Sequence, residues 1–201
     1  MHKLTRVLLF ANAGRTLATA QSTTGPMRVA VIGGGVAGCA LSHGLREEVA
    51  AGRATVTLVE MGRGPGGRAA TRTTRDDPRL RVSHGAPAFR VTDERFRALL
   101  AALADGATAP ATAPVGALTA ANEFVPEAPA RERREGGGGR GTAALCEALL
   151  ASGGAVERRF GTMVRAIDAL PGRAAGEPVA WRLVDRDGGE IGVFDWLAVS
   201  G

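Results

Sequence analysis

The glycines at positions 33, 35 and 38 form the first residue pattern in this sequence that points to chemistry. They follow the apolar run "RVAVI" and open the stretch "GGGVAGCALSHGLREE", whose apolar residues recur at helical spacing. A Gly-x-Gly-x-x-Gly turn between a strand and a helix lets a diphosphate approach the backbone, and the free N–H groups of the first helical turn attract its charge. The spacing of Gly33, Gly35 and Gly38 therefore predicts a phosphate-binding turn. The alternative is a tight turn that only packs the helix against the strand.

An acidic residue stands where such a site needs one. The second apolar run, "ATVTLVE", ends at Glu60, 22 residues after Gly38. A carboxylate at the end of this strand accepts hydrogen bonds from the ribose hydroxyls of an adenosine, and it repels a 2′-phosphate. Strand, glycine turn, helix, second strand and acid together predict a βαβ dinucleotide-binding unit, and the acid disfavours NADP as its ligand.

A glycine-rich loop, "MGRGPGGRAATR", follows Glu60 directly. Glycine permits a close approach of the backbone to a ligand, and the arginine guanidinium offers a fixed fork of donors to phosphate. Gly66, Gly67 and Arg68 are therefore candidates for a second contact with the same anion. The alternative is a solvated loop, because every basic residue except Lys3 is arginine, which indicates the coding bias of a GC-rich genome.

The two motifs in this order resemble the fingerprints of the flavoprotein family that includes amine oxidases, phytoene desaturases and renalase. The later segment "VSHGAPAF" is similar to a part of the renalase-like branch, and "GRGTAALCEAL" and "FGTMVRAID" resemble parts shared by the wider family. The resemblance extends over residues 28–201, with gaps at 105–135. It implies that FAD is the cofactor and that the glycine pair and arginine lie beside its diphosphate. It also implies that the backbone of Val164 meets the adenine.

From this resemblance we expect the FAD-binding portion of a flavin-dependent oxidoreductase, in which an unknown small-molecule reductant transfers hydride to the flavin. Members of the family normally run longer, with most of a substrate domain and a C-terminal glycine-containing FAD motif beyond the point that corresponds to Gly201. We therefore expect a truncated chain whose substrate domain is largely absent. The alternative is a non-catalytic FAD- or NAD-binding module, or a degenerate paralogue.

The sequence does not identify a catalytic side chain or a metal ligand. Flavin chemistry belongs to the cofactor and needs neither a triad nor a metal, and the sequence shows neither pattern. His84 lies in "VSHGAPAF", which the resemblance brings near the flavin ring, but a structural histidine is the preferred interpretation. His43 is interpreted as a surface or helix-packing residue. Cys39 and Cys146 lack metal-ligand spacing and are interpreted as small core residues.

Charge and hydropathy restrict the partners. The first acidic residue is Glu47, and from there on arginines and acids cancel, so the net charge of +5 belongs to the N-terminal end. A nucleic-acid binder would instead carry a basic face on its folded body, which makes that class the weakest of those considered. No run reaches the roughly 18–20 apolar residues of a membrane span. We therefore expect neither nucleic acid nor a membrane span, and the partners that the resemblance implies are FAD and a small molecule.

Residues 1–26 resemble an address signal. They contain no acid, carry spaced basic residues and are rich in Ala and Thr, as organelle transit peptides are. This predicts a chloroplast or mitochondrial location if the leader is translated. A secretory signal is disfavoured because Arg15 interrupts its apolar run. Translation from Met27 would instead give a cytoplasmic protein.

The rest of the chain divides into three parts. Residues 27–104 hold the βαβ unit, the arginine motif and a helix capped by Asp93, and residues 105–141 form a flexible Ala/Pro/Gly-rich segment. Residues 142–201 hold a helix capped by Thr142 and a β-meander that begins with "VERRF". The predicted fold is α/β, a Rossmann-like doubly wound parallel sheet with a small antiparallel β-meander.

Overall fold

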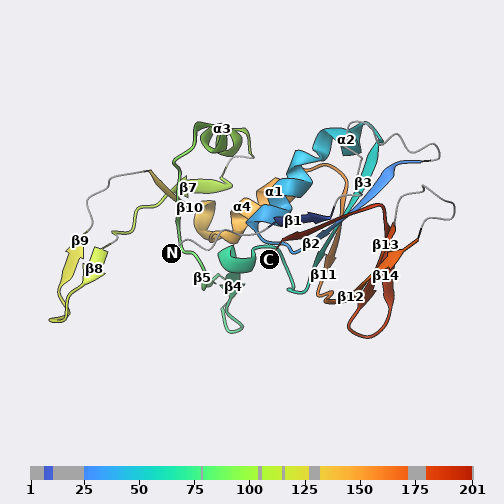
Figure 1. Cartoon of the computed structure of the whole chain (residues 1–201). Coiled ribbons are helices and arrows are strands. Elements are labelled where there is room, and N and C mark those ends of the chain that lie inside the picture. The colour runs from blue at the N-terminus through green and yellow to red at the C-terminus, as the bar shows by residue number, and fades with distance from the viewer. Residues whose placement is uncertain are drawn as a thin grey trace.

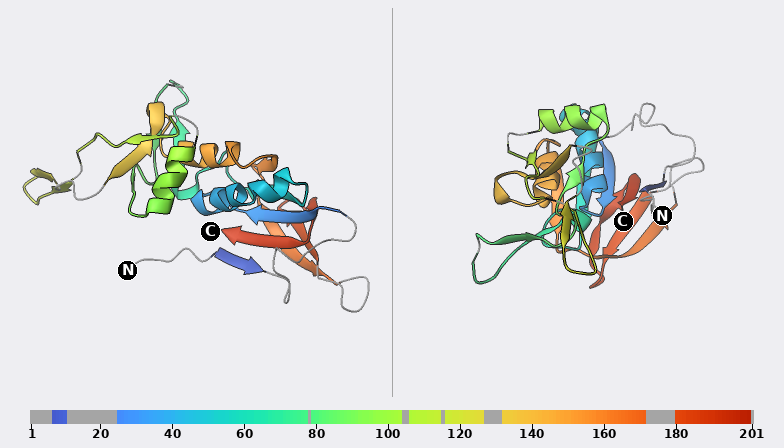
Figure 2. Two further views of the ribbon diagram at one scale, coloured as in Figure 1. Left: turned by 90° about the horizontal axis from the view of Figure 1, so that it is seen from above. Right: turned by 90° about the vertical axis from the view of Figure 1, so that its left-hand side faces the viewer.

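The computed structural model describes residues 7–10, 25–77, 79–103, 106–114, 116–126, 132–171 and 180–200. The architecture is α/β, as predicted. A five-stranded, mostly parallel sheet is covered on one face by helices and on the other by a small antiparallel sheet (Figures 1 and 2). A second group of short strands, with one α-helix, extends from this body (Figure 1).

The main sheet has the strand order β1-β15-β2-β3-β11. Its strands are β1 (Val7–Phe10), β2 (Met27–Ile32), β3 (Ala54–Glu60), β11 (Val156–Phe160) and β15 (Trp196–Ser200). The last four run parallel, and β1 pairs with β15 in the antiparallel direction. The chain leaves β2 toward β3 on one side and returns as β15 on the other, so the strand order reverses at β2. Ligands of open α/β sheets bind at the carboxyl ends of the strands beside such a reversal.

Strand β11 lies in the parallel sheet and not in the meander. The prediction that "VERRF" begins the meander was wrong, because all five residues of this strand pair in parallel with β3. The meander consists of β12 (Val164–Leu170), β13 (Ala180–Asp185) and β14 (Glu190–Phe194). Its last turn is closed by Asp185, whose carboxylate accepts hydrogen bonds from the N–H groups of Asp187 and Gly189.

Apolar side chains cover both faces of the main sheet, which explains the uninterrupted apolar runs of its strands. The helical face carries α1 (Val36–Gly44), α2 (Arg46–Ala50) and α4 (Ala143–Ala151). Its core includes Val29, Val31, Cys39, Val56, Leu58, Cys146, Leu149 and Trp196. On the opposite face the meander residues Leu183, Ile191 and Phe194 share a core cluster with Ala30, Val59 and Leu197.

The second group is built mostly from short strands, of which the sequence pattern indicated only those in "RLRVSHGAPAFRV", a stretch that reads as a strand interrupted at Gly85. Its elements are η1 (Gly67–Ala69), β4 (Thr71–Thr73), β5 (Arg81–Ser83), β6 (Phe89–Arg90), α3 (Glu94–Ala102), β7 (Thr108–Pro110), β8 (Gly116–Leu118), β9 (Phe124–Pro126), β10 (Arg133–Gly136) and η2 (Gly137–Gly139). Strand β10 pairs with both β6 and β7, so the structure places sheet within the segment expected to be flexible, residues 105–141. The β8–β9 hairpin extends away from the rest of the molecule at the left of Figure 1.

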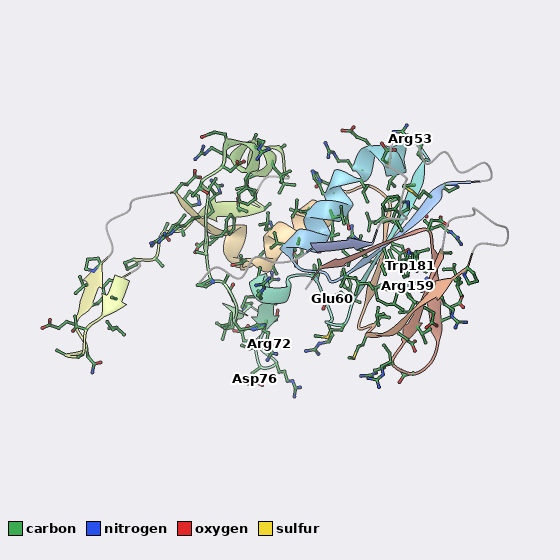
Figure 3. The ribbon with its side chains drawn as sticks, viewed as in Figure 1. Arg53, Glu60, Arg72, Asp76, Arg159 and Trp181 are labelled. Atoms are coloured by element: carbon green, nitrogen blue, oxygen red, sulfur yellow. The ribbon has the colours of Figure 1, made fainter. Side chains whose placement is uncertain are left out.

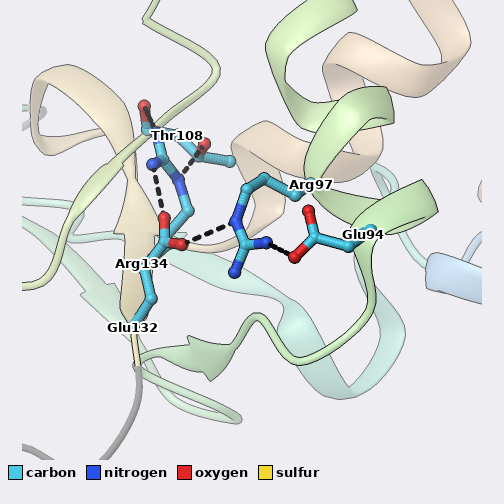
Figure 4. A network of polar contacts seen from close by, with 5 residues as sticks. All are labelled: Glu94, Arg97, Thr108, Glu132 and Arg134. Carbon is cyan, nitrogen blue, oxygen red and sulfur yellow. Dashed lines mark hydrogen bonds and ion pairs between the residues drawn. The ribbon is translucent and has the colours of Figure 1, made fainter.

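Helix α3 has the predicted cap and is tied to the neighbouring sheet by ion pairs. Asp93 accepts hydrogen bonds from two N–H groups of the first turn, at 2.9 and 3.0 Å. Arg97 pairs with Glu94 and, at 3.2 Å, with Glu132, whose other carboxylate oxygen binds Arg134 at 3.0 Å (Figure 4). Because Arg134 lies on β10 and also bonds a threonine of β7, the network joins α3, β7 and β10.

The predicted side-chain cap of α4 is absent. The hydroxyl of Thr142 donates to the carbonyl oxygen of Pro87 at 3.0 Å instead of accepting from its own helix. Two hydroxyls from the β4–β5 hairpin accept from the start of the helix: Ser83 from Thr142 N at 3.2 Å and Thr71 from Ala143 N at 3.3 Å. The helix is therefore capped from a distant part of the chain, which local sequence cannot reveal.

Strand β1 lies within the predicted N-terminal extension. Its four residues pair with β15, from Val7 opposite Ser200 to Phe10 opposite Leu197. It therefore forms one edge of the main sheet (Figure 2). The interpretation of residues 1–26 as a transit peptide stays a prediction.

Candidate dinucleotide-binding site

The outer glycines of the first turn are required by packing. Gly33 has a positive φ of 107°, and a Cβ there would overlap with the backbone carbonyl of Ser200 at the end of β15. A Cβ on Gly38 would overlap with the carbonyl of Gly33, which also accepts a hydrogen bond from Ser200 Oγ at 3.2 Å. The close approach of α1 to β2 and β15 therefore excludes a side chain at both positions.

Gly35 differs from these two because its missing side chain faces open space. A Cβ at this position would have no neighbouring atom of the described chain within 4 Å, and its φ of −73° suits any residue. Packing therefore gives no reason for a glycine here. Gly35 is also the N-cap of α1, which has neither a side-chain cap nor an acid in its first turn. The positive end of the helix dipole is thus left available to an anion beside Gly35.

Glu60 is fixed beside this turn by two backbone N–H groups. Its carboxylate oxygens accept hydrogen bonds from Gly34 N and Gly62 N, both at 2.6 Å. The side chain is half-buried at the carboxyl end of β3 (Figure 3). Each carboxylate oxygen has a second lone pair, so the group can still accept hydrogen bonds from the two adjacent hydroxyls of a ribose.

Gly34 and Gly62 are site residues that sequence reasoning missed. A Cβ on Gly34 would lie 3.0 Å from both Cβ and Cγ of Glu60, and a Cβ on Gly62 would lie 2.8 Å from its Oε1. A side chain at either position would therefore displace the carboxylate. Both residues are glycines beside the chosen motifs, but their role depends on the direction of the Glu60 side chain, which spacing does not give.

The glycine–arginine loop lies against the first turn. Gly66 N donates to Gly34 O at 2.8 Å, and Gly66 forms a parallel bridge with Gly35. Gly66 and Gly67 have positive φ values of 140° and 53°, and a Cβ on Gly67 would lie 3.2 Å from Gly35 Cα. The structure therefore brings the two predicted motifs to one place, at the carboxyl ends of β2 and β3.

Arg68 follows in η1 with an exposed side chain. Its carbonyl oxygen accepts a hydrogen bond from Ala86 N at 2.8 Å, and a Cβ on Gly85 would overlap with the same oxygen. The segment that carries the exposed His84 is thereby packed on the arginine loop. Glycine at position 85 is required by this contact.

Val164 is linked to the same edge through the residues before it. Gly161 N donates to Gly62 O at 2.8 Å, and the next N–H donates to Glu60 O at 3.0 Å. Val164 itself is half-buried at the start of β12. The segment predicted to meet an adenine is therefore bonded to the backbone of the residue predicted to bind the ribose.

Two exposed methionines border this region, and sequence reasoning did not single them out. Met61 directly follows Glu60 and Met163 directly precedes Val164, with 72% and 44% of their surfaces exposed. Apolar side chains combined with a few fixed polar groups are typical of small-molecule sites. Each methionine is thus an exposed apolar side chain next in sequence to a residue that was predicted to contact the nucleotide.

The other residues singled out from the sequence are structural. His43, near the end of α1, lies 3.0 Å from Ser152 Oγ, so it packs α1 against α4, as interpreted. Burial, together with the positive charge of Arg46, lowers the pKa of His43. Cys39 and Cys146 are fully buried in the core, also as interpreted.

Neither a metal-ion cluster nor a membrane-spanning helix is found in the described ranges. Asp76 lies exposed between β4 and β5 (Figure 3). Among the residues that the structure describes, no cluster of His, Cys, Asp and Glu could hold a metal ion. No helix in this part of the chain is long and apolar enough to cross a membrane.

Comparison with a known protein family agrees with the geometry of this edge. Residues 31–103 match the family model of the NAD(P)-binding Rossmann-like domain. The chain carries a Rossmann-like domain. The match includes the glycine turn, Glu60 and the glycine–arginine loop, which the structure brings together. No curated protein matches the chain.

Solved structures show the same fold. A protein assigned as a protoporphyrinogen oxidase, from an Exiguobacterium species, has a TM-score of 0.55 and 16% identity, over 85% of this chain and 58% of that one. A Diels-Alderase of pyrroindomycin biosynthesis has a TM-score of 0.51 and 16% identity, over 85% of this chain and 31% of that one. At such identity the likeness shows the fold alone. This Rossmann-like chain spans less than two thirds of either protein's length.

Proposed function

We propose that this chain is the FAD-binding portion of a flavin-dependent oxidoreductase of the renalase-like kind, in which a small-molecule reductant transfers hydride to the flavin. The observation that carries the proposal is the backbone of Gly34. Its N–H donates to Glu60 and its carbonyl accepts from Gly66 N. One residue thus joins the first glycine turn, the candidate ribose carboxylate and the second glycine loop.

The residues at this edge fit the AMP half of FAD. Glu60 would accept the ribose hydroxyls, and the open space at Gly35 would admit the diphosphate. Arg68 would place positive charge beside that diphosphate, and Met61 and Met163 would border the adenine. FAD, when bound, supplies the hydride acceptor, while this chain binds and orients it.

The reaction class, the family branch and the location in the proposal are supported by the comparisons and by the sequence. The name of one structural neighbour, a protoporphyrinogen oxidase, favours an oxidoreductase. The renalase-like branch and the transfer of hydride from a small reductant rest on the sequence resemblance. An organelle location, suggested by residues 1–26, belongs to the same proposal.

A non-catalytic nucleotide-binding module is the second candidate. It is favoured by the matched family, which is named for NAD(P). Glu60 would repel the 2′-phosphate of NADP but would accept the free ribose hydroxyls of NAD or FAD. Such a module would bind FAD or NAD without turnover.

The first experiment is an absorbance spectrum of the full chain after incubation with FAD and desalting. We expect the visible and near-ultraviolet flavin bands to survive desalting. Glu60→Gln should weaken binding about tenfold or more, because a hydrogen bond to a charged group is lost. Glu157→Gln is the matched control, since this carboxylate on β11 binds Thr57 and Arg159 and touches neither glycine loop. A folded but colourless protein, or equal loss in both variants, would contradict FAD binding at this edge.

Anaerobic addition of reductants then separates the two candidates. Amines, reduced nicotinamides, reduced quinones and polyenes represent the substrate classes that remain open. Bleaching of the flavin bands by one class supports the oxidoreductase. Bound FAD that none of them bleaches, or binding of NAD in preference to FAD, supports the non-catalytic module.

A further inference from the structure

The carbonyl oxygen of Gly34 is also bonded from the protein interior, by a thiol. Cys39 Sγ donates to Gly34 O at 3.3 Å, and Gly66 N donates to the same oxygen at 2.8 Å. This oxygen belongs to the peptide that joins Gly34 to Gly35. The structure has no cis peptide bond among its described residues, so the N–H of this peptide points opposite to its oxygen. Two bonds that hold the oxygen inside therefore aim Gly35 N–H outward.

The position of Cys39 suits this donor role. It lies one turn into α1 and is fully buried, as is Cys146 on α4. The neighbouring Cys146 thiol and burial both raise the pKa of the Cys39 thiol, so it keeps its proton at neutral pH. An alanine or leucine could fill the apolar core at this place, but neither could donate to Gly34 O.

We propose that Cys39 is a positioning residue for nucleotide binding: its thiol fixes the Gly34–Gly35 peptide so that Gly35 N–H faces the space in which a diphosphate would lie. The inference deepens the proposed function and rests on it for the identity of the ligand. Cys39 touches no ligand and acts only through Gly34 O. Because the space beside Gly35 is open, the orientation of its N–H can affect ligand binding.

The test compares two buried thiols in the full chain. Cys39→Ala removes the donor to Gly34, and Cys39→Ser restores a donor in the form of a hydroxyl. Cys146→Ala and Cys146→Ser are the matched controls, because they change an equally buried thiol and leave Cys39 and its bond to Gly34 in place. Affinity for FAD and for ADP-ribose is measured by titration calorimetry, and stability by thermal denaturation.

We expect Cys39→Ala to weaken binding of both ligands about three- to tenfold, the range for one lost hydrogen bond. Cys39→Ser and both Cys146 variants should bind within about twofold of the unaltered chain. Both alanine variants should lose stability, because each leaves a small cavity. Equal weakening by Cys39→Ala and Cys146→Ala, or weakening by Cys39→Ala that Cys39→Ser does not reverse, would overturn the proposal.

A second measurement separates this inference from the proposed function. Amide hydrogen exchange of Gly66 in the ligand-free protein reports whether Gly34 O stays fixed, since Gly66 N donates to it. The exchange should be faster in Cys39→Ala than in Cys146→Ala, and unchanged exchange would refute the role of Cys39. If the unaltered chain binds neither FAD nor ADP-ribose, the proposed function fails, while this comparison still decides whether Cys39 fixes the peptide.

Discussion

Three consecutive glycines at the end of β2 lack a side chain for three different reasons. A Cβ on Gly33 would overlap with Ser200, a Cβ on Gly34 would press on Glu60, and a Cβ on Gly35 would meet no atom of the described chain. The first two are requirements of the folded protein itself. Packing gives no such reason for the third, so substitution can separate stability from binding.

Gly35→Ala should leave the fold intact and strongly weaken nucleotide binding. The backbone at Gly35 has φ −73° and ψ −179°, which alanine adopts without strain, and its Cβ meets no atom within 4 Å. Such a replacement changes stability by less than about 1 kcal/mol. The added methyl group would occupy the space of the diphosphate, and binding of FAD and ADP-ribose should fall at least about tenfold, more than one lost hydrogen bond. Titration calorimetry and thermal denaturation of the same sample measure both effects.

Gly33→Ala is the counterpart that should reduce stability. Its φ of 107° is strained for alanine, and its Cβ would overlap with the carbonyl of Ser200. We expect a loss of about 2 kcal/mol or more in the free energy of unfolding. If Gly35→Ala instead bound FAD normally, the diphosphate would have to lie elsewhere than over this residue.

At the residue scale, the sequence was enough to predict residues whose role depends on their spacing along the chain. The spacing of Gly33, Gly35 and Gly38 specifies a strand–turn–helix geometry, and the structure has that geometry. Gly34 and Cys39 could not be chosen in this way. Their roles follow from the direction of the Glu60 side chain and from the turn of α1 over Gly34, both of which arise only after the strands pair.

At the element scale, packing between α1 and α4 holds in place the helix that begins at the glycine turn. The glycine turn opens α1, and the far end of this helix is held to α4 through His43 and Ser152, 3.0 Å apart. Local pattern identified both helices, because their apolar residues recur at helical spacing. It failed for β11 and β10, since a short apolar or charged run does not show which distant strand it will pair with.

The contact between α1 and α4 should weaken in acid. Burial and the charge of Arg46 lower the pKa of His43 below its ordinary value of 6.5, so the unfolded chain takes up a proton at a higher pH than the folded chain. Stability is therefore complete above about pH 6.5 and falls as the pH drops from there toward the folded pKa. Thermal midpoints between pH 8 and pH 5 measure this loss. His43→Gln should flatten the profile over this interval, and an unchanged slope in that variant would assign the loss to other groups.

At the scale of the whole molecule, different elements cover the two faces and the edges of the main sheet. Helices cover one face and the meander covers the other, while the carboxyl ends of β2 and β3 carry both glycine loops (Figure 1). Strand β1 covers the edge of β15. The sequence did not indicate this pairing, because two strands almost 190 residues apart leave no local signature. The address signal predicted for this region stays a prediction.

Removal of residues 1–26 should expose the edge of β15. An uncovered edge strand presents unpaired N–H and C=O groups that can pair with another chain. We expect residues 27–201 to melt below the full chain and to self-associate as concentration rises, as measured by thermal denaturation and by light scattering during size-exclusion chromatography. Replacing Leu8 and Leu9 together by proline in the full chain should have the same effect. Consecutive N–H groups of a strand point to opposite sides, so one of the two prolines removes a bond to β15. A shortened chain that stays monomeric with an unchanged melting temperature would mean that β1 is dispensable, as a cleavable transit peptide requires.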